Sequence, residues 1–163
     1  MNYEQFIKEL DRKLANYFEL HKAYIHCKPG CSACCEKGDY PLTSIELEYL
    51  MKGYIALDNT TKQVIQQNIN EIEKGGACPF LVDKKCSVYA HRPIICRVHG
   101  LAYRYKENKL KLPYCANYGL NYANILKNGE IIIDIVFENL DTQNILKTSE
   151  FGETRNLYDW IKR

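Results

Sequence analysis

Four cysteines lie within nine residues near the start of the chain, in the run Cys27-Lys-Pro-Gly-Cys31-Ser-Ala-Cys34-Cys35. Thiolates held this close together form a soft, anionic pocket, which suits zinc, iron or an iron–sulfur cluster. Adjacent cysteines such as Cys34 and Cys35 would strain a disulfide, so a set of disulfides is the weaker interpretation. The expected fold is therefore one organised around a cysteine-rich metal site.

Four more cysteines follow at wider spacing, which brings the total to eight. The predicted metal ligands are Cys27, Cys31, Cys34, Cys35, Cys78, Cys86, Cys96 and Cys115. Eight thiolates divide into two sets of four, the usual number for structural zinc and for a cubane cluster. Because Cys34 and Cys35 cannot easily point the same way, they either serve different sites or bridge one polynuclear site.

The compartment is indicated by the N-terminal segment and by the cysteines. Charged side chains interrupt residues 1–14, so no signal peptide is expected. The sequence contains no long uncharged apolar run, so we expect no membrane span. The predicted location is the cytoplasm, where reducing conditions make eight cysteines more typical of metal ligands than of disulfides.

The chain is close to neutral, with 22 basic and 20 acidic residues and a formal charge of +2. Such a balance argues against nucleic acid as a general partner. Metal ligation requires thiolates, so eight bound cysteines would add eight negative charges, of which two divalent metals offset half. The basic side chains of the segment 84–111 would supply further positive charge.

Helical periodicity and helix-end signals predict a predominantly α (α+β) fold: several helices and a short β-hairpin in a single domain, 1–163, with the cysteine motif over 27–115. Thr43 and Glu46 have the spacing of a capping box that starts a helix over 44–54. The other predicted helices cover 2–24, 58–74, 118–126 and 153–162, and a short one starts near Pro93.

Two segments have the pattern of a β-hairpin, and the first of them also fits a looped turn. In the first, 78–86, an apolar stretch is followed by a polar turn, and in the second, 101–112, apolar residues alternate on both sides of a Glu107-Asn108 turn. The segment 131–137 fits either a strand or a helix, because its β-branched run favours a strand whereas Asp134 and the following Glu138 allow a helix.

Arg92 and Arg97 flank Cys96 in the sequence. A guanidinium beside a sulfur ligand stabilises the thiolate and tunes the potential of a cluster, which makes both arginines candidate residues of the metal site. The alternative is that they serve only as surface charge and helix caps. His99 is a further candidate ligand, since imidazole replaces thiolate at zinc and at some iron sites.

Short motifs accompany the later cysteines: Cys78-Pro-Phe-Leu, Cys86-Ser-Val-Tyr and Arg92-Pro-x-x-Cys96-Arg97. Together with Cys27-x3-Cys31-x2-Cys34-Cys35 and Cys115, they resemble the bacterial zinc- or iron-chelating cysteine-cluster family, the CxxCxxCC or YkgJ-like proteins. The resemblance covers Cys27 to Cys115. It implies a small cytoplasmic metal-binding domain and specifies neither the metal nor a reaction.

The spacing of the cysteines bears on the choice of metal. Zinc ribbons usually show two closely spaced cysteine pairs. Here the later cysteines are widely scattered, which is easier to reconcile with the ligands of an iron–sulfur cluster. The sequence therefore favours an iron–sulfur cluster over zinc by a small margin.

Three classes of function follow from these features. The first is a metal-binding protein with a redox or electron-transfer role, whose partners are metal ions and a candidate redox protein. The second is a metal-dependent transferase or oxidoreductase with an open coordination position, although the sequence has no GxGxxG or P-loop motif. The third is a zinc-stabilised module that binds RNA or protein through the basic, tyrosine-rich segment 84–111.

Overall fold

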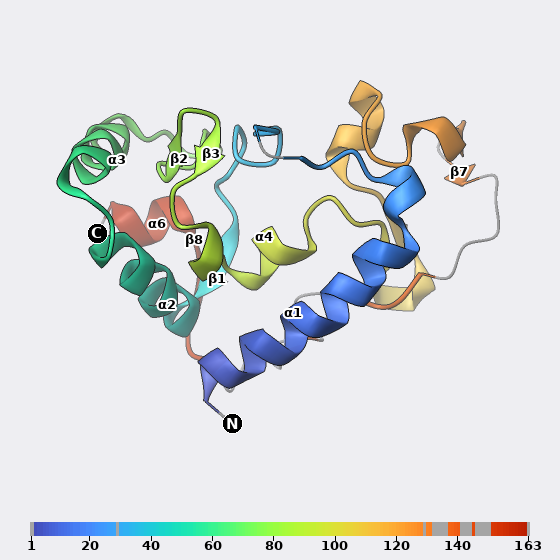
Figure 1. The fold of residues 1–163 in the computed structure, drawn as a ribbon, viewed down its shortest axis with the longest axis horizontal. Helices are drawn as coiled ribbons and strands as arrows, with labels where there is room; N and C mark the ends of the chain where they lie inside the picture. Colours follow the sequence, from blue (N-terminus) through green and yellow to red (C-terminus); the bar gives the residue numbers. More distant parts are fainter. Residues whose placement is uncertain are drawn as a thin grey trace. The chain divides into compact units, whose positions relative to one another are not determined.

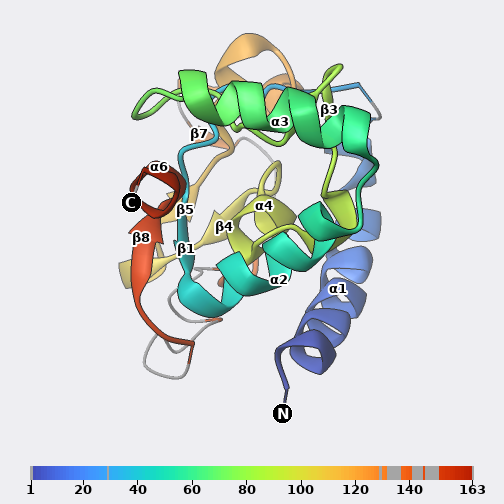
Figure 2. The ribbon, with the colours of Figure 1, turned by 90° about the vertical axis from the view of Figure 1, so that its left-hand side faces the viewer.

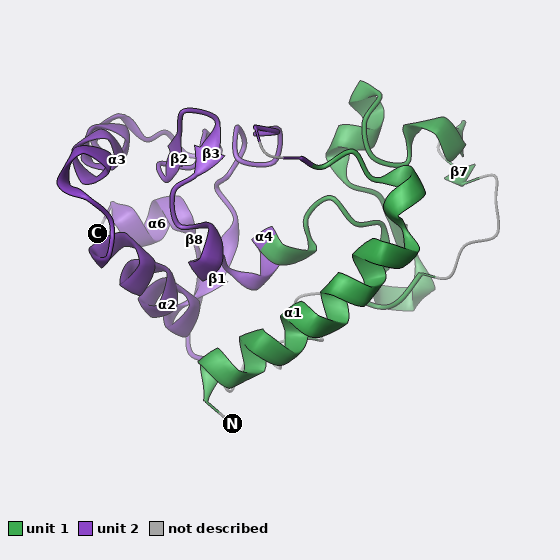
Figure 3. Ribbon diagram, in the orientation of Figure 1, with its two compact units in different colours: residues 1–27, 97–145 green, residues 28–96, 146–163 purple. Residues whose placement is uncertain are grey.

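The computed structural model describes residues 2–28, 30–128, 130–131, 137–140, 145 and 151–162. The chain forms two compact units, coloured separately in Figure 3. Unit 1 comprises Met1–Cys27 and Arg97–Ile145, and unit 2 comprises Lys28–Cys96 and Leu146–Arg163. In the described residues, helices predominate over short two-stranded antiparallel pairs, which confirms the predicted predominantly α (α+β) fold. The single domain 1–163 stays a prediction.

Unit 1 begins with the long helix α1 (Tyr3–Leu20), drawn in blue in Figure 1. Its N-cap, Asn2, accepts a hydrogen bond from the backbone N–H of Gln5 at 2.8 Å. The helix buries one apolar face, made of Tyr3, Ile7, Leu10, Leu14 and Tyr17. A 3-10 turn, η1 (Lys22–Tyr24), completes the segment for which a helix over 2–24 was predicted.

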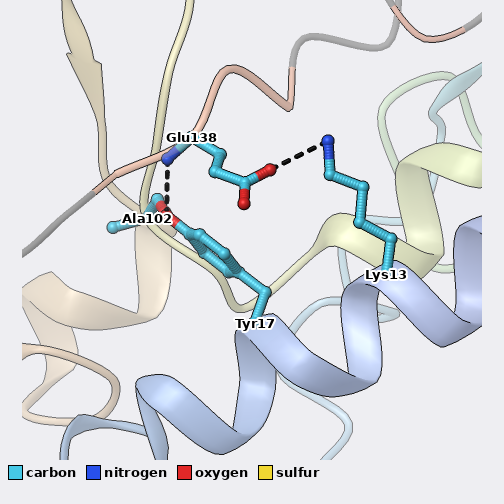
Figure 4. Close-up of polar contacts among 4 residues, drawn as sticks. All are labelled: Lys13, Tyr17, Ala102 and Glu138. Atoms are coloured by element: carbon cyan, nitrogen blue, oxygen red, sulfur yellow. Dashed lines mark hydrogen bonds and ion pairs between the residues drawn. The ribbon is translucent and has the colours of Figure 1, made fainter.

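The hydroxyl of Tyr17 connects α1 to two other segments of unit 1 (Figure 4). It donates to the carbonyl of Ala102 at 3.2 Å and accepts from the backbone N–H of Glu138 at 3.0 Å. Lys13, one turn earlier, forms an ion pair of 2.8 Å with the Glu138 carboxylate. Burial raises the pKa of the Tyr17 hydroxyl, so it stays protonated and able to donate at neutral pH.

The remainder of unit 1 consists of short elements. β4 (Tyr103–Arg104) pairs with β5 (Leu110–Lys111), which confirms the predicted hairpin with its turn at Glu107-Asn108. The turn includes η3 (Lys106–Asn108), and both Glu107 and Asn108 have positive φ angles. β6 (Leu126–Lys127) pairs with β7 (Glu130–Ile131). Of the ambiguous segment 131–137, residues 132–136 lie outside the described residues.

The helix predicted over 118–126 is wrong. Two 3-10 turns occupy this region instead, η4 (Tyr114–Tyr118) and η5 (Ala123–Ile125). Gly119 at φ 75° and Tyr122 at φ 63° adopt left-handed conformations, which interrupt any continuous right-handed helix.

Unit 2 has a hydrophobic core to which several of its helices and strands contribute. The elements are β1 (Pro41–Thr43), α2 (Ser44–Ile55), α3 (Asn59–Glu71), β2 (Leu81–Val82), β3 (Lys85–Cys86), η2 (Tyr89–His91), β8 (Thr154–Asn156) and α6 (Leu157–Ile161). Of the short helix α4 (Ile94–Val98), the residues up to Cys96 belong to unit 2. The buried core residues are Leu42, Leu50, Ile65, Phe80, Val88 and Leu157.

A pair of strands distant in sequence joins the two parts of unit 2. β1 pairs antiparallel with β8, with Leu42 opposite Arg155, and the two strands lie side by side in Figure 2. The helix predicted over 153–162 is therefore correct only in its second half, because residues 154–156 are extended and pair with β1. The Trp160 indole, in α6, donates to the carbonyl of Leu42 at 3.0 Å.

The predicted capping box at the start of α2 is present, and its glutamate also forms a hydrogen bond to a distant segment. Glu46 Oε2 accepts from the Thr43 backbone N–H at 2.7 Å, while Thr43 Oγ1 accepts from the Glu46 N–H at 3.3 Å. The second carboxylate oxygen, Oε1, accepts from the backbone N–H of Ile94 at 2.9 Å. Glu46 is only 2 % exposed, and this bond fixes the start of α4, the helix that carries Cys96.

In the part of the chain that is described, no helix combines the length and the apolar character needed to cross a membrane.

Replacing Glu46 with glutamine should lower the free energy of unfolding by about 1–3 kcal/mol, because the amide nitrogen then faces a buried N–H donor. Urea denaturation of the reduced protein measures the change. Glu48, which is exposed on the same helix, provides the matched control, and Glu48→Gln should change the free energy by about 0.5 kcal/mol or less. Equal stability of Glu46→Gln and the wild type would contradict this role.

Candidate metal centre

The hairpin formed by β2 and β3 carries Cys86 and follows directly after Cys78. Leu81 pairs with Cys86, and the turn residues Asp83 and Lys84 adopt positive φ angles of 48° and 59°. Asn68, on α3, donates its side-chain amide to the carbonyl of Pro79 at 3.0 Å. The hairpin predicted over 78–86 is thus confirmed and is anchored to a helix of the same unit.

The cysteine turn contacts this hairpin through the backbone. The N–H of Cys78 donates to the carbonyl of Cys35 at 2.8 Å. Gly38 lies so close that a Cβ placed there would be 2.4 Å from the Cβ of Cys78. A side chain at position 38 would therefore force the hairpin away from the cysteine turn. Tyr40 adds a further restraint, since its hydroxyl donates to the carbonyl of Cys34 at 2.9 Å.

Asp39 fixes the segment that leaves the cysteine turn. Its Oδ2 accepts from the backbone N–H of Gly75 at 2.9 Å, and its Oδ1 accepts from that of Tyr158 at 2.9 Å. A single carboxylate thereby joins three segments of unit 2 that are far apart in sequence. Sequence analysis missed this role, because an aspartate between a glycine and a nearby proline is also an ordinary loop residue.

Five thiols of unit 2 lie close enough to influence one another's ionisation: Cys34, Cys35, Cys78, Cys86 and Cys96. The Sγ atoms of Cys34 and Cys35 are 4.0 Å apart. The hydrogen bond between them lowers the pKa of Cys34 to about 7 and raises that of Cys35. Within the pair, one thiolate is thus stabilised at the expense of the other.

Burial and mutual repulsion act together on the other three thiols of this group. Burial raises the pKa of Cys78 to about 12, with a smaller contribution from the negative charge of Cys86. Burial likewise raises the pKa of Cys86, and it raises that of Cys96 well above the ordinary value. These thiols bind protons at pH 7, so a metal that takes them as thiolates must displace the protons.

Arg92 is the cation of this group. Its guanidinium lies over the Tyr89 ring, 3.5 Å from the ring centroid. Its positive charge lowers the pKa of Cys34, Cys86 and Cys96, which opposes the effect of burial on the last two. The position of Arg92 is therefore one from which it stabilises thiolates.

The other three predicted ligands are Cys27, Cys31 and Cys115. Cys31 belongs to unit 2 and is exposed. Cys27 and Cys115 belong to unit 1, where Cys27 is exposed and Cys115 is buried. All eight cysteines are in the described part of the chain, and each is a thiol.

Arg97 is also in unit 1, where it binds a carboxylate. Its Nη1 donates to both carboxylate oxygens of Asp11, at 2.7 and 2.6 Å, and its side chain is only 3 % exposed. Its predicted role as a donor to sulfur stays a prediction.

The histidines occupy different environments. His21 is buried, with its ring stacked on Tyr17 and its Nδ1 2.9 Å from the Tyr122 hydroxyl. Burial lowers the pKa of His99 to about 4, so its imidazole is neutral at pH 7. A neutral imidazole is the form that ligates metal, and His99 stays a candidate.

The donor chemistry of unit 2 fits a thiophilic ion such as zinc or iron, because several thiols and a guanidinium share one region. Among the residues that the structure describes, no three histidine, cysteine, aspartate or glutamate side chains are arranged to hold a metal ion. The fit therefore rests on the kind of donors and their grouping.

Comparison with known proteins agrees with this donor set. The chain belongs to the CxxCxxCC family, described as a "Putative zinc- or iron-chelating domain", which matches residues 26–116, more than half of its length. An uncharacterized protein of Methanocaldococcus jannaschii is 33% identical over 97 residues, which cover 55% of this chain and 51% of that protein. The chain thus spans about half the length of this relative. No solved structure matches the chain.

Replacing Arg92 with glutamine should raise the pKa of Cys34 from about 7, because a stabilising positive charge is lost. Alkylation of Cys34 by iodoacetamide in reduced, metal-depleted protein, followed by mass spectrometry across a pH series, measures the shift. At pH 7 the variant should react more slowly. Lys85→Gln, which removes an exposed charge on β3, is the control and should leave the pH profile unchanged. Identical profiles for Arg92→Gln and the wild type would rule out the effect.

Proposed function

We propose that this protein holds an iron–sulfur cluster through thiolates of unit 2 and uses it to carry electrons or to sense redox state. The proposed ligands of this cluster are drawn from Cys34, Cys35, Cys78, Cys86 and Cys96. Cys27, Cys31 and Cys115 stay proposed metal ligands that are assigned to no particular site. The observation that carries the proposal is the mutual influence of five thiols that come from three separate parts of the chain.

The grouping supports metal binding because several of these thiols can be ionised together only when a cation offsets their charge. Neighbouring thiolates repel one another, and burial removes the water that would otherwise screen them. Inert thiols would pack equally well when dispersed through the core. A group of this kind is consistent with the family's zinc- or iron-chelating description.

The scatter of the ligands supports iron–sulfur rather than zinc. Cys34 and Cys35 lie in a turn, Cys86 in a hairpin and Cys96 in a helix. Cluster ligands commonly come from separate loops, whereas structural zinc ligands usually come in close pairs. The proposal requires side-chain rotations that bring four of these sulfurs to within about 2.3 Å of their metal atoms.

Iron in a thiolate-held cluster, when bound, supplies one-electron redox chemistry. The chain supplies the thiolates, and Arg92 supplies a positive charge that offsets part of their negative charge. The expected partner is a one-electron carrier protein, and the expected compartment is the cytoplasm, where these thiols stay reduced.

Anaerobic purification followed by visible spectroscopy and by iron, sulfide and zinc analysis tests the proposal. We expect a brown protein that contains iron and acid-labile sulfide. A colourless protein that contains only zinc would contradict the iron–sulfur cluster.

The corresponding variant is Cys86→Ser, which should lose most of the visible absorbance. Ser87→Ala is its matched control, because it removes the adjacent hydrogen bond from Ser87 Oγ to the carbonyl of Phe80 but leaves the sulfur in place. Full cluster content in Cys86→Ser would exclude this residue as a ligand.

A further inference from the structure

Asn121 is a buried side chain of unit 1 that contacts a predicted metal ligand. It lies between η4 and η5, is 1 % exposed, and forms three hydrogen bonds. Its Oδ1 accepts from the backbone N–H of His26 at 2.7 Å. Its Nδ2 donates to the carbonyl of Gly100 at 2.7 Å and to Cys27 Sγ at 3.0 Å.

These three bonds determine the orientation of the amide. An asparagine side chain has two N–H donors and one acceptor oxygen. The backbone N–H of His26 can only donate, so it requires the oxygen on its side, and the carbonyl of Gly100 requires the nitrogen on the other. The second N–H is thereby directed at Cys27 Sγ.

The backbone around Asn121 leaves little freedom for the sulfur. Gly100 has φ +92°, and a Cβ added there would lie 2.9 Å from Cys27 Sγ and 3.1 Å from Asn121 Nδ2. Tyr122 is fully buried in a left-handed conformation at φ 63°, and its N–H donates to the carbonyl of Tyr24 at 2.7 Å. A bulky residue adopts this conformation only at an energetic cost, so the surrounding contacts must enforce it.

We propose that Asn121 is a positioning residue for the sulfur of Cys27. It fixes the backbone before Cys27 through His26 and donates a hydrogen bond to the Cys27 thiolate when that thiolate binds metal. Cys27 itself is exposed, so packing restrains its side chain less than it restrains a buried one. The inference rests on the proposed function in one respect, that Cys27 is a metal ligand.

Asn121→Asp tests the inference, because it keeps an acceptor for His26 and removes the donor to sulfur. Metal-depleted, reduced protein is titrated anaerobically with Co²⁺, and the thiolate-to-cobalt charge-transfer band reports sulfur ligation. We expect Asn121→Asp to lower Co²⁺ affinity by about 10- to 100-fold and to reduce the band to the level of Cys27→Ser. Unchanged affinity and an unchanged band would overturn the inference.

A double-mutant cycle separates positioning from general destabilisation. In the Cys27→Ser background, Asn121→Asp should cause no further loss of Co²⁺ affinity, because its effect acts through the missing sulfur. Equal losses in both backgrounds would overturn the inference. Tyr17→Phe is the matched control: it removes a hydroxyl bonded to Ala102 and Glu138 in the same unit without touching sulfur, and should leave the band unchanged.

Two outcomes distinguish failure of the inference from failure of the proposed function. If Cys27→Ser leaves the Co²⁺ band unchanged, Cys27 is not a ligand and that part of the proposed function fails. If Cys27→Ser reduces the band and Asn121→Asp does not, only the positioning role fails.

A measurement on the wild type avoids any folding defect of the variants. In ¹¹³Cd²⁺-loaded protein, the Asn121 side-chain amide proton should show scalar coupling to the metal through the hydrogen bond to Cys27 sulfur. A bound ¹¹³Cd²⁺ that is coupled to the Cys27 side chain but not to this amide would overturn the inference.

Discussion

Repulsion among neighbouring thiolates is the constraint on which the arrangement of unit 2 depends. Cys78, Cys86 and Cys96 are partly removed from water, and negative charge on Cys78 or Cys86 raises the pKa of Cys96. Cys78 and Cys86 also pack against the hydrophobic core of the unit. Positive charge nearby favours the ionised form of these thiols, and Arg92 provides some of that charge. A bound metal would provide the rest and would allow several of these thiols to be ionised at once.

The scaffold holds the thiol-bearing segments through backbone groups, so that the sulfur atoms themselves stay available. Two carboxylates contribute most directly: Asp39 binds the backbone N–H groups of Gly75 and Tyr158, and Glu46 binds that of Ile94. Hydrogen bonds to an ionised carboxylate are stronger than those between neutral groups. A backbone hydrogen bond, from the N–H of Cys78 to the carbonyl of Cys35, also holds two thiol-bearing segments together. Glycine at position 38 permits this close approach.

Local features of the fold could be predicted from sequence, and long-range ones could not. The capping box at Thr43 and the hairpin turn after Val82 depend on residues a few positions apart, so their signals are complete within a short window. The pairing of β1 with β8 joins residues more than a hundred positions apart, and residues 154–156 alone indicate a helix as readily as a strand. The left-handed Tyr122 has no sequence signal, because bulky residues rarely adopt that conformation.

The same distinction applies to the candidate site. Arg92 was expected near the thiols because it stands close to Cys96 in sequence, and its charge does act on Cys34, Cys86 and Cys96. The bond between Arg97 and Asp11 could not be foreseen, since 86 positions separate them. Asn121 was missed for the same reason. Its amide donates a hydrogen bond to the sulfur of Cys27, which is 94 positions away, and nothing in the local sequence distinguishes it from other loop asparagines.

X-ray absorption at the iron and zinc edges, on anaerobically purified protein, tests the central claim most directly. The account predicts a first coordination shell of sulfur alone, at about 2.3 Å from the bound metal. A first shell of nitrogen and oxygen would contradict it, because the cysteines would then not be the ligands.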